Sequence, residues 1–302
     1  MSSPLSPLRD ELLGTVLGSA EAVDLLLTAL LAKGHALVTG PPGIGKTTLA
    51  QTLATSLSGA FKRVQFTPDL LPSDILGYNL CQPQTGEFTF IAGPVFANLM
   101  LADEINRASP RTQSSLLEAM NERQVTIDGE TRPLPDPFMV VATQNDSSTT
   151  GTFPLPEPQL DRFLLSIPMS LPDDATQLSI LRFHSEQRET KKGSAILSLE
   201  ELRSLQNATA AIPVSDTLQR YLLSLCQAVR TVLGNDHAVS TRATLALQRA
   251  AQATAVLDGQ DAVHPDHVQS VFAHVLRHRL LSEDTPDPEN LLLSALEQTP
   301  VP

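Results

Sequence analysis

The stretch GPPGIGKTT at positions 40–48 constrains the fold more than any other feature of the chain. It follows the apolar segment HALVTG, which predicts a strand, and precedes a segment that predicts a helix through Leu57. Glycines let a loop turn tightly so that its N–H groups face phosphate oxygens, and the following helix adds its positive N-terminal dipole. In this pattern Lys46 reaches nucleotide phosphates and Thr47 offers a hydroxyl to Mg²⁺. We expect nucleotide binding by Gly40, Pro41, Pro42, Gly43, Ile44, Gly45, Lys46, Thr47 and Thr48.

A second segment, LMLADE at positions 99–104, is an apolar strand pattern that ends in two carboxylates. This is the Walker B pattern that accompanies such a phosphate loop. We expect Asp103 to hold Mg²⁺, mainly through water, and Glu104 to polarise the attacking water as a general base. The alternative is an acidic turn after a strand, which the phosphate loop upstream disfavours.

Strand patterns and helix patterns alternate over the first two thirds of the chain. Five strand segments lie at about 35–40, 63–67, 99–104, 139–145 and 164–169. Such alternation predicts an α/β fold with a parallel sheet covered by helices on both faces. Turns at Thr85-Gly86 and Asp128-Gly129 predict two hairpins, and Ser109-Pro110 predicts the start of a helix that runs to Glu122.

The pattern changes near Asp173, beyond which successive amphipathic helices follow. We expect residues 1–193 to form the nucleotide-binding core and residues 194–302 an all-α lid. The segment KKGSA at 191–195 is the expected hinge between them.

Composition disfavours several classes of function. A net charge of −12 with a pI near 5.0 disfavours gripping a nucleic-acid backbone. The two cysteines, Cys81 and Cys226, form no disulfide framework, which fits a reducing compartment. The N-terminus lacks the pattern of a signal peptide, and the apolar run 25–31 is too short for a membrane span. We therefore expect a soluble, cytoplasmic protein.

Longer motifs carry a resemblance to a known family. The stretches are LLPSDILG, TGEF, GPVFANLMLADEINRA, TQSSLLEAMNERQVTIDGE, ATQN and GTFPLPEPQLDRF. In this order and spacing they resemble the MoxR family of AAA+ ATPases over roughly 37–280. The resemblance implies an AAA+ core with a five-stranded parallel sheet, two β-hairpin insertions and an all-α lid. It also implies ATP and Mg²⁺ as cofactors.

The same resemblance implies how the protein acts. Family members form rings, typically hexameric, and remodel or mature a client protein, often with a von Willebrand factor A domain partner. Neither the client nor the partner is named by the sequence. The alternatives are the motor subunit of a metal chelatase and a nucleotide-gated scaffold with little hydrolysis. A DNA-dependent motor is a further alternative, which the acidic charge disfavours.

Three more residues receive roles from the resemblance. Asn145 resembles the sensor 1 residue that orients the attacking water, although asparagine is also common in turns after strands. Arg162 resembles the arginine finger that reaches a neighbouring subunit's ATP; the alternative is an ion pair with Asp161 or Glu157. Arg242 resembles the sensor 2 arginine. A cation in the first turn of a helix opposes the helix dipole, which suggests a nearby anion.

Two segments depart from the plain pattern. Asp146 stands where the family usually has proline after ATQN, close to the sensor and finger residues. The hairpin from Tyr78 to Phe90 gathers three aromatic residues around Pro83, and we expect it to contact the client. The alternative is that Phe88 and Phe90 pack on the core.

Histidines 267, 274 and 278 share one helical face, but no cysteine lies nearby and a metal site is not expected.

Overall fold

The computed structural model describes residues 5–145, 151–185, 195–281 and 288–302. The loop that contains Asp146 lies outside the described residues. So do residues 191–194 of the expected hinge and the acidic segment 282–287.

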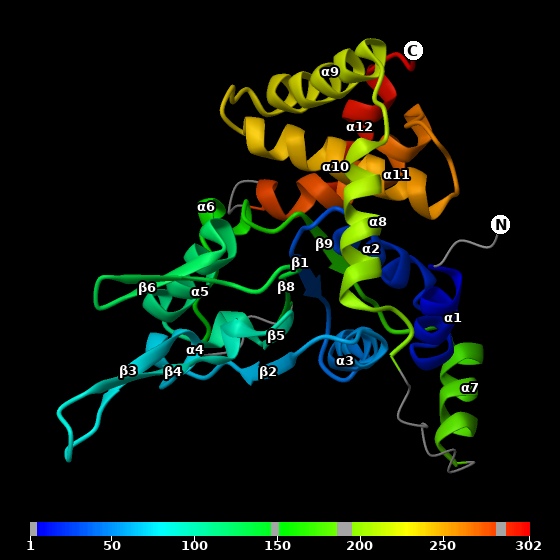
Figure 1. Cartoon of the computed structure of the whole chain (residues 1–302). Helices are drawn as coiled ribbons and strands as arrows, with labels where there is room; N and C mark the ends of the chain where they lie inside the picture. The colour runs from blue at the N-terminus through cyan, green and yellow to red at the C-terminus, as the bar shows by residue number, and fades with distance from the viewer. Residues whose placement is uncertain (1–4, 146–150, 186–194, 282–287) are drawn as a thin grey trace.

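Five parallel strands form the central sheet, in the order β2-β5-β8-β1-β9 (Figure 1). They are β1 (Ala36–Thr39), β2 (Phe61–Gln65), β5 (Leu99–Asp103), β8 (Met139–Gln144) and β9 (Leu165–Pro168). The predicted five-stranded parallel sheet is confirmed. The bounds predicted for the second strand, 63–67, are wrong by two residues at each end. Pairing with β5 joins Phe61 to Leu99 and Gln65 to Asp103, so the register sets these bounds.

Each central strand faces two separate hydrophobic cores, because successive side chains point to opposite faces of a sheet. In β5, Leu99 and Leu101 belong to one core, whereas Met100 and Ala102 belong to the other. On the first side lie α1 (Ser6–Thr15), α2 (Ala20–Leu31) and α3 (Lys46–Ser56). On the second lie α4 (Pro72–Leu76), η1 (Pro94–Phe96), η2 (Ile105–Arg107) and α5 (Pro110–Glu122). Both faces are therefore covered, as the alternation predicts.

Two antiparallel hairpins project from the second side (Figure 1). The first pairs β3 (Gly77–Cys81) with β4 (Phe88–Ala92), and the second pairs β6 (Gln124–Ile127) with β7 (Glu130–Pro133). Asp128 and Gly129 both have positive φ, 51° and 82°, which is the turn expected for this dipeptide. The hairpins contact each other, since Asn79 Nδ2 donates to Asp128 Oδ2 over 2.7 Å.

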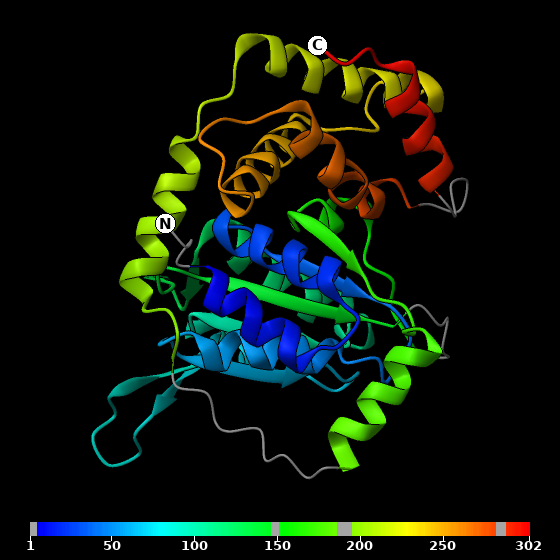
Figure 2. The same ribbon diagram turned by 90° about the vertical axis from the view of Figure 1, so that its right-hand side faces the viewer.

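The C-terminal part of the chain is helical. It follows β9 and contains α7 (Asp174–Ser185), α8 (Leu199–Ala211), α9 (Asp216–Leu233), α10 (Thr241–Leu257), α11 (Pro265–Leu280) and α12 (Glu289–Gln298). A short helix, α6 (Glu157–Leu160), precedes β9. Helices α9 to α12 form a bundle above the sheet, while α7 lies apart, beside α1 (Figures 1 and 2). Serine side chains cap α8, α9 and α10 by accepting a backbone N–H of the first turn.

Helix α8 connects the core to the bundle and contacts both. Leu57 and Leu197 form a parallel bridge, and Gln206 Nε2 donates to the carbonyl of Leu30 over 2.8 Å. Buried side chains of α2 and of the bundle belong to one continuous hydrophobic core. Division at 193/194 into core and lid stays a proposal.

Candidate functional site

The order of the strands brings three predicted site segments to one edge of the sheet. The phosphate loop follows β1, Asp103 ends β5, and Asn145 follows β8, which lies between them. Since the carboxyl ends of parallel strands meet at one edge, this edge is where open α/β sheets bind ligands. Helix α3 begins there at Lys46, with Gly45 as its N-cap at φ 95°.

The phosphate loop lines a cleft of about 860 Å³. Gly40 has φ 141°, and a Cβ at this position would lie 2.2 Å from the carbonyl oxygen of Met169. Only glycine fits there, so the tight start of the loop depends on this residue. The far end of the cleft is more apolar and is lined by Val16, Leu17, Leu171, Ile180 and Leu181. The volume falls within the range of ligand pockets.

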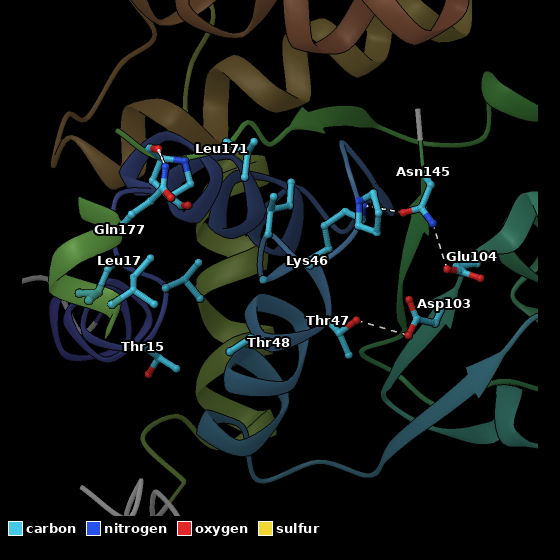
Figure 3. A pocket seen from close by; sticks show the side chains of 18 of the residues that line it. Thr15, Leu17, Lys46, Thr47, Thr48, Asp103, Glu104, Asn145, Leu171 and Gln177 are labelled. Atoms are coloured by element: carbon cyan, nitrogen blue, oxygen red, sulfur yellow. Dashed lines mark hydrogen bonds between the residues drawn. The ribbon is translucent and has the colours of Figure 1, made fainter. Parts of the chain in front are cut away.

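Lys46 is 7% exposed, and its ammonium group is held by oxygen atoms. Nζ donates to the carbonyl of Pro41 over 2.8 Å and to that of Gly40. It also donates to Oδ1 of Asn145 over 2.7 Å (Figure 3). The lysine therefore points into the loop, where phosphate oxygens could replace these acceptors.

The carboxylate of Asp103 is engaged at both oxygens. Oδ1 accepts from Oγ1 of the buried Thr143 over 2.6 Å. Oδ2 faces Oγ1 of Thr47 at 3.3 Å and accepts from Nη2 of Arg63 over 2.7 Å. Figure 3 shows the first of these Oδ2 contacts, from the start of α3 to the end of β5.

Glu104 has an unusual backbone and is held by several partners. Its φ is 55°, a left-handed conformation that is uncommon for a non-glycine residue and that clusters at functional sites. Oε1 accepts from Nδ2 of Asn145 over 2.9 Å. Oε2 accepts from Arg107 over 2.8 Å and from Gln65 over 3.2 Å. The amide of Asn145 thus joins Lys46 to Glu104. Its oxygen must face the ammonium group and its NH₂ the carboxylate, because only the oxygen accepts and only the nitrogen donates.

Sequence reasoning missed four residues of this cluster, which are Arg63, Gln65, Arg107 and Thr143. For Arg63 and Gln65, the sequence shows that both side chains point to the same face of the predicted strand. Arg63 and Gln65 alternate along β2, the strand that the register places beside β5. The pairing of β2 with β5 is not visible in the sequence, because Gln65 and its partner Asp103 lie 38 positions apart.

The two arginines expected to act on the nucleotide do not line this cleft. Arg162 donates from Nη1 to the carbonyl of Leu117 over 2.8 Å, which differs from the expected alternative of an ion pair. Arg242, whose side chain is 55% exposed, contacts Oδ2 of Asp161 at 3.3 Å. Its position in the first turn of α10, after the Ser240 cap, agrees with the prediction.

The first hairpin has one packed aromatic residue and two exposed ones. Phe90 packs edge-on against Phe96, and Arg132 lies 4.1 Å from the centre of its ring. Tyr78 and Phe88 are 46% and 71% exposed. The packing alternative therefore holds for Phe90 and is wrong for Phe88.

The described residues lack two further features. No cluster of three or more histidine, cysteine or acidic side chains there could hold a metal ion. Across the same residues, no helix is both long and apolar enough to cross a bilayer.

A phosphate loop between β1 and α3, an acidic pair at the end of β5 and a helical lid define a P-loop ATPase of the AAA+ class. Comparison with known proteins agrees. Residues 35–165 match the model of the ATPase family associated with various cellular activities, and residues 227–296 match the AAA lid domain.

Three relatives place the chain further. The chaperone MoxR1 of Mycobacterium tuberculosis is 42% identical over 88% of this chain and 72% of its own length. The protein MoxR of Paracoccus denitrificans is 34% identical over 96% of this chain and 94% of its own length. An uncharacterized protein, YeaC of Bacillus subtilis, is 42% identical over 88% of this chain and 83% of its own.

The fold has a close match among solved structures. The crystal structure of a candidate ATPase from Cytophaga hutchinsonii superposes with a TM-score of 0.88 at 34% identity, covering 99% of this chain and 95% of that one. The chain belongs to the MoxR family of AAA+ ATPases.

Proposed function

We propose that this protein hydrolyses ATP with Mg²⁺ as a cytoplasmic ring, and that it uses the energy to remodel a client protein. The observation that carries the proposal is the meeting of Lys46, Thr47, Asp103, Glu104 and Asn145 at one end of a single cleft. These residues come from three segments of the chain, and a cleft that gathers ionisable side chains from separate segments is typical of a functional site.

The cleft suits a nucleoside triphosphate along its length. Backbone N–H groups of the phosphate loop and the start of α3 would bind the phosphates, and Lys46 would exchange its present carbonyl partners for phosphate oxygens. The apolar end between Val16 and Leu171 would receive the base. We infer that Thr48 and the loop residues on either side of Gly43 hold the phosphates through their backbone.

The metal-binding residues fit Mg²⁺. The hydroxyl of Thr47 and Oδ2 of Asp103 face each other at 3.3 Å, and both are hard oxygen donors. Mg²⁺ typically takes one or two protein oxygens and completes its shell with water and substrate phosphates. When bound, the ion would neutralise charge that develops on the phosphates.

Glu104 and Asn145 would prepare the attacking water. Glu104 would accept a proton from the water through one carboxylate oxygen, and Asn145 would orient that water. In the structure Oε2 of Glu104 accepts from both Gln65 and Arg107, whereas Oε1 accepts from Asn145 alone within the described part of the chain, so Oε1 is the oxygen that would accept the proton of the water.

Arg162 and Arg242 do not line the cleft of their own chain. We propose that Arg162 completes the site of a neighbouring subunit as an arginine finger. We propose that Arg242 anchors the helical lid to the nucleotide as the sensor 2 arginine. The name of the relative, chaperone MoxR1, supports a client to be remodelled. We propose the hexameric ring and the von Willebrand factor A domain partner from the family resemblance alone.

Nucleotide binding is tested with Lys46→Ala. We expect its affinity for a fluorescent ATP analogue to fall by at least about 100-fold, since the phosphates lose a buried cation in place. Lys62→Ala is the matched control, because Lys62 is an exposed lysine on β2 that does not line the cleft. Near-normal affinity of the Lys46→Ala form would overturn the assignment.

A further inference from the structure

Arg63 is the residue of the cleft whose charge the proposed reaction does not yet use. It lies in the middle of β2, the strand at the edge of the sheet, and it lines the cleft. Its side chain is 45% exposed, whereas that of Asp103 is 8% exposed. Nη2 and Nε donate to the same carboxylate oxygen, Oδ2 of Asp103, over 2.7 and 3.2 Å.

That oxygen is the one a metal ion would need. The other oxygen of Asp103 accepts from Thr143, which is fully buried and belongs to the neighbouring strand β8. Only Oδ2 faces Thr47, the second expected metal-binding residue. A water bound to Mg²⁺ between Thr47 and Asp103 would donate its hydrogen bond to Oδ2, where the guanidinium of Arg63 now donates two.

Arg63 can also move away from Asp103. On an edge strand with a half-exposed side chain, it can turn towards solvent without opening a packed core. A buried carboxylate without a cationic partner is costly, so a cation beside Asp103 stabilises the carboxylate whenever no metal ion is bound. Arginine supplies that charge, and two cations at one carboxylate oxygen repel each other when the metal ion arrives.

We propose that Arg63 holds the place of the hydrated Mg²⁺ ion on Asp103 and is displaced by it. The proposal rests on the proposed Mg²⁺ and nucleotide site. It makes Arg63 a positioning residue that lowers the affinity of the site for the metal–nucleotide complex and keeps Asp103 neutralised when the metal is absent.

The test is the affinity for fluorescent methylanthraniloyl-ADP, measured for the full chain in EDTA and in saturating Mg²⁺. With Arg63→Gln, binding in EDTA should weaken, because an uncompensated Asp103 repels the phosphates. Binding in Mg²⁺ should tighten, because no ion pair must break. The dissociation constant in EDTA divided by that in Mg²⁺ should therefore rise by about threefold to tenfold, the range expected for a partly exposed ion pair.

Two further variants sharpen the test. Lys62→Gln removes the same charge from the adjacent, exposed position of β2, which does not line the cleft, and should leave the ratio unchanged. Arg63→Lys keeps the charge but loses the two-pronged donor, so its ratio should lie between those of the parent and Arg63→Gln. If Arg63→Gln fails to fold, Arg63→Lys still tests the proposal, because its ratio should exceed that of the parent.

Two outcomes would overturn the proposal. One is an unchanged ratio with Arg63→Gln. The other is an equal loss of affinity in EDTA and in Mg²⁺, which would make Arg63 an ordinary phosphate contact. Failure of the underlying function looks different, since the unmodified protein would then not bind the nucleotide under either condition.

Discussion

Arg279 of helix α11 donates from Nε to Oδ1 of Asp161 over 2.8 Å, and thereby ties the helical bundle to the residue that precedes Arg162. The Arg279 side chain is only 4% exposed and that of Asp161 17%. Arg279 also donates to the carbonyls of Phe163 and Leu164, at 2.6 and 3.2 Å. Burial lowers the pKa of this arginine, while the hydrogen bond to Asp161 raises it.

We expect Asp161→Asn to destabilise the protein, because it leaves a buried guanidinium without its counter-charge. The backbone carbonyls still accept from Arg279, so the loss should be about 2–3 kcal/mol, below the usual cost of breaking a buried pair. For a chain of this size that corresponds to a melting temperature lower by about 3–5 °C. Differential scanning calorimetry measures it.

Arg242→Met is the control for this effect. It removes the exposed partner of the same carboxylate and should cost no more than about 1 kcal/mol. Equal effects of the two variants would show that the Asp161–Arg279 pair does not hold the bundle to the core.

Glu104→Gln should bind ATP but hydrolyse it about 10²–10⁴-fold more slowly, because an amide does not accept the proton of the attacking water. Steady-state phosphate release measures turnover, and a fluorescent ATP analogue measures binding. Glu118→Gln, an exposed change on α5, is the control and should turn over normally. Turnover of Glu104→Gln close to that of the parent would exclude Glu104 as the base.

Arg162→Ala should bind ATP normally and lose most hydrolysis, since arginine fingers contribute about 10³–10⁵ in rate to related phosphoryl transfers. If Arg162 acts on the site of a neighbouring subunit, mixed rings of two inactive variants should regain activity. Subunits with Arg162→Ala keep an intact cleft, and subunits with Lys46→Ala keep an intact finger, so mixing the two should restore part of the phosphate release.

The mixture needs its own control. Each variant alone should stay inactive at the same total concentration, and subunit exchange is followed by energy transfer between labelled chains. Exchange without any recovered activity would mean that Arg162 acts within its own chain or not at all.

For the first hairpin, we expect replacement of residues 82–87 by Gly-Ser-Gly to leave ATP turnover within a few fold and to reduce client or partner capture by the Glu104→Gln form. Phe88→Ala should act in the same direction and change stability by less than about 0.5 kcal/mol, because its ring is 71% exposed. Phe90→Ala should instead lower the melting temperature, since Phe90 packs on Phe96 and under Arg132.

Quantitative mass spectrometry of the captured proteins measures the hairpin effect. Unchanged capture by the shortened hairpin, with the fold intact, would place the client contact elsewhere. Loss of the fold would show that the hairpin is structural.

Local pattern was sufficient for the elements and for the phosphate loop. Strand patterns predicted all five strands of the sheet, the second of them two residues too late. Ser109-Pro110 predicted the start of α5, and the helix pattern after it predicted an end near Glu122. The spacing of Gly40, Gly45 and Lys46 predicted a loop between strand and helix, which the structure contains. Such signals succeed because they act over a few residues, through backbone conformation and side-chain periodicity.

The sequence by itself thus determined the class of protein, the order of its strands and helices, and the residues that carry the phosphate and acidic motifs. Only the tertiary structure decided that Arg63 binds Asp103, that Arg279 binds Asp161, and that Arg162 lies outside its own cleft. The members of these two ion pairs lie 40 and 118 residues apart in the chain. They meet because of strand order and helix packing, which depend on the burial of the whole core rather than on any local stretch of sequence.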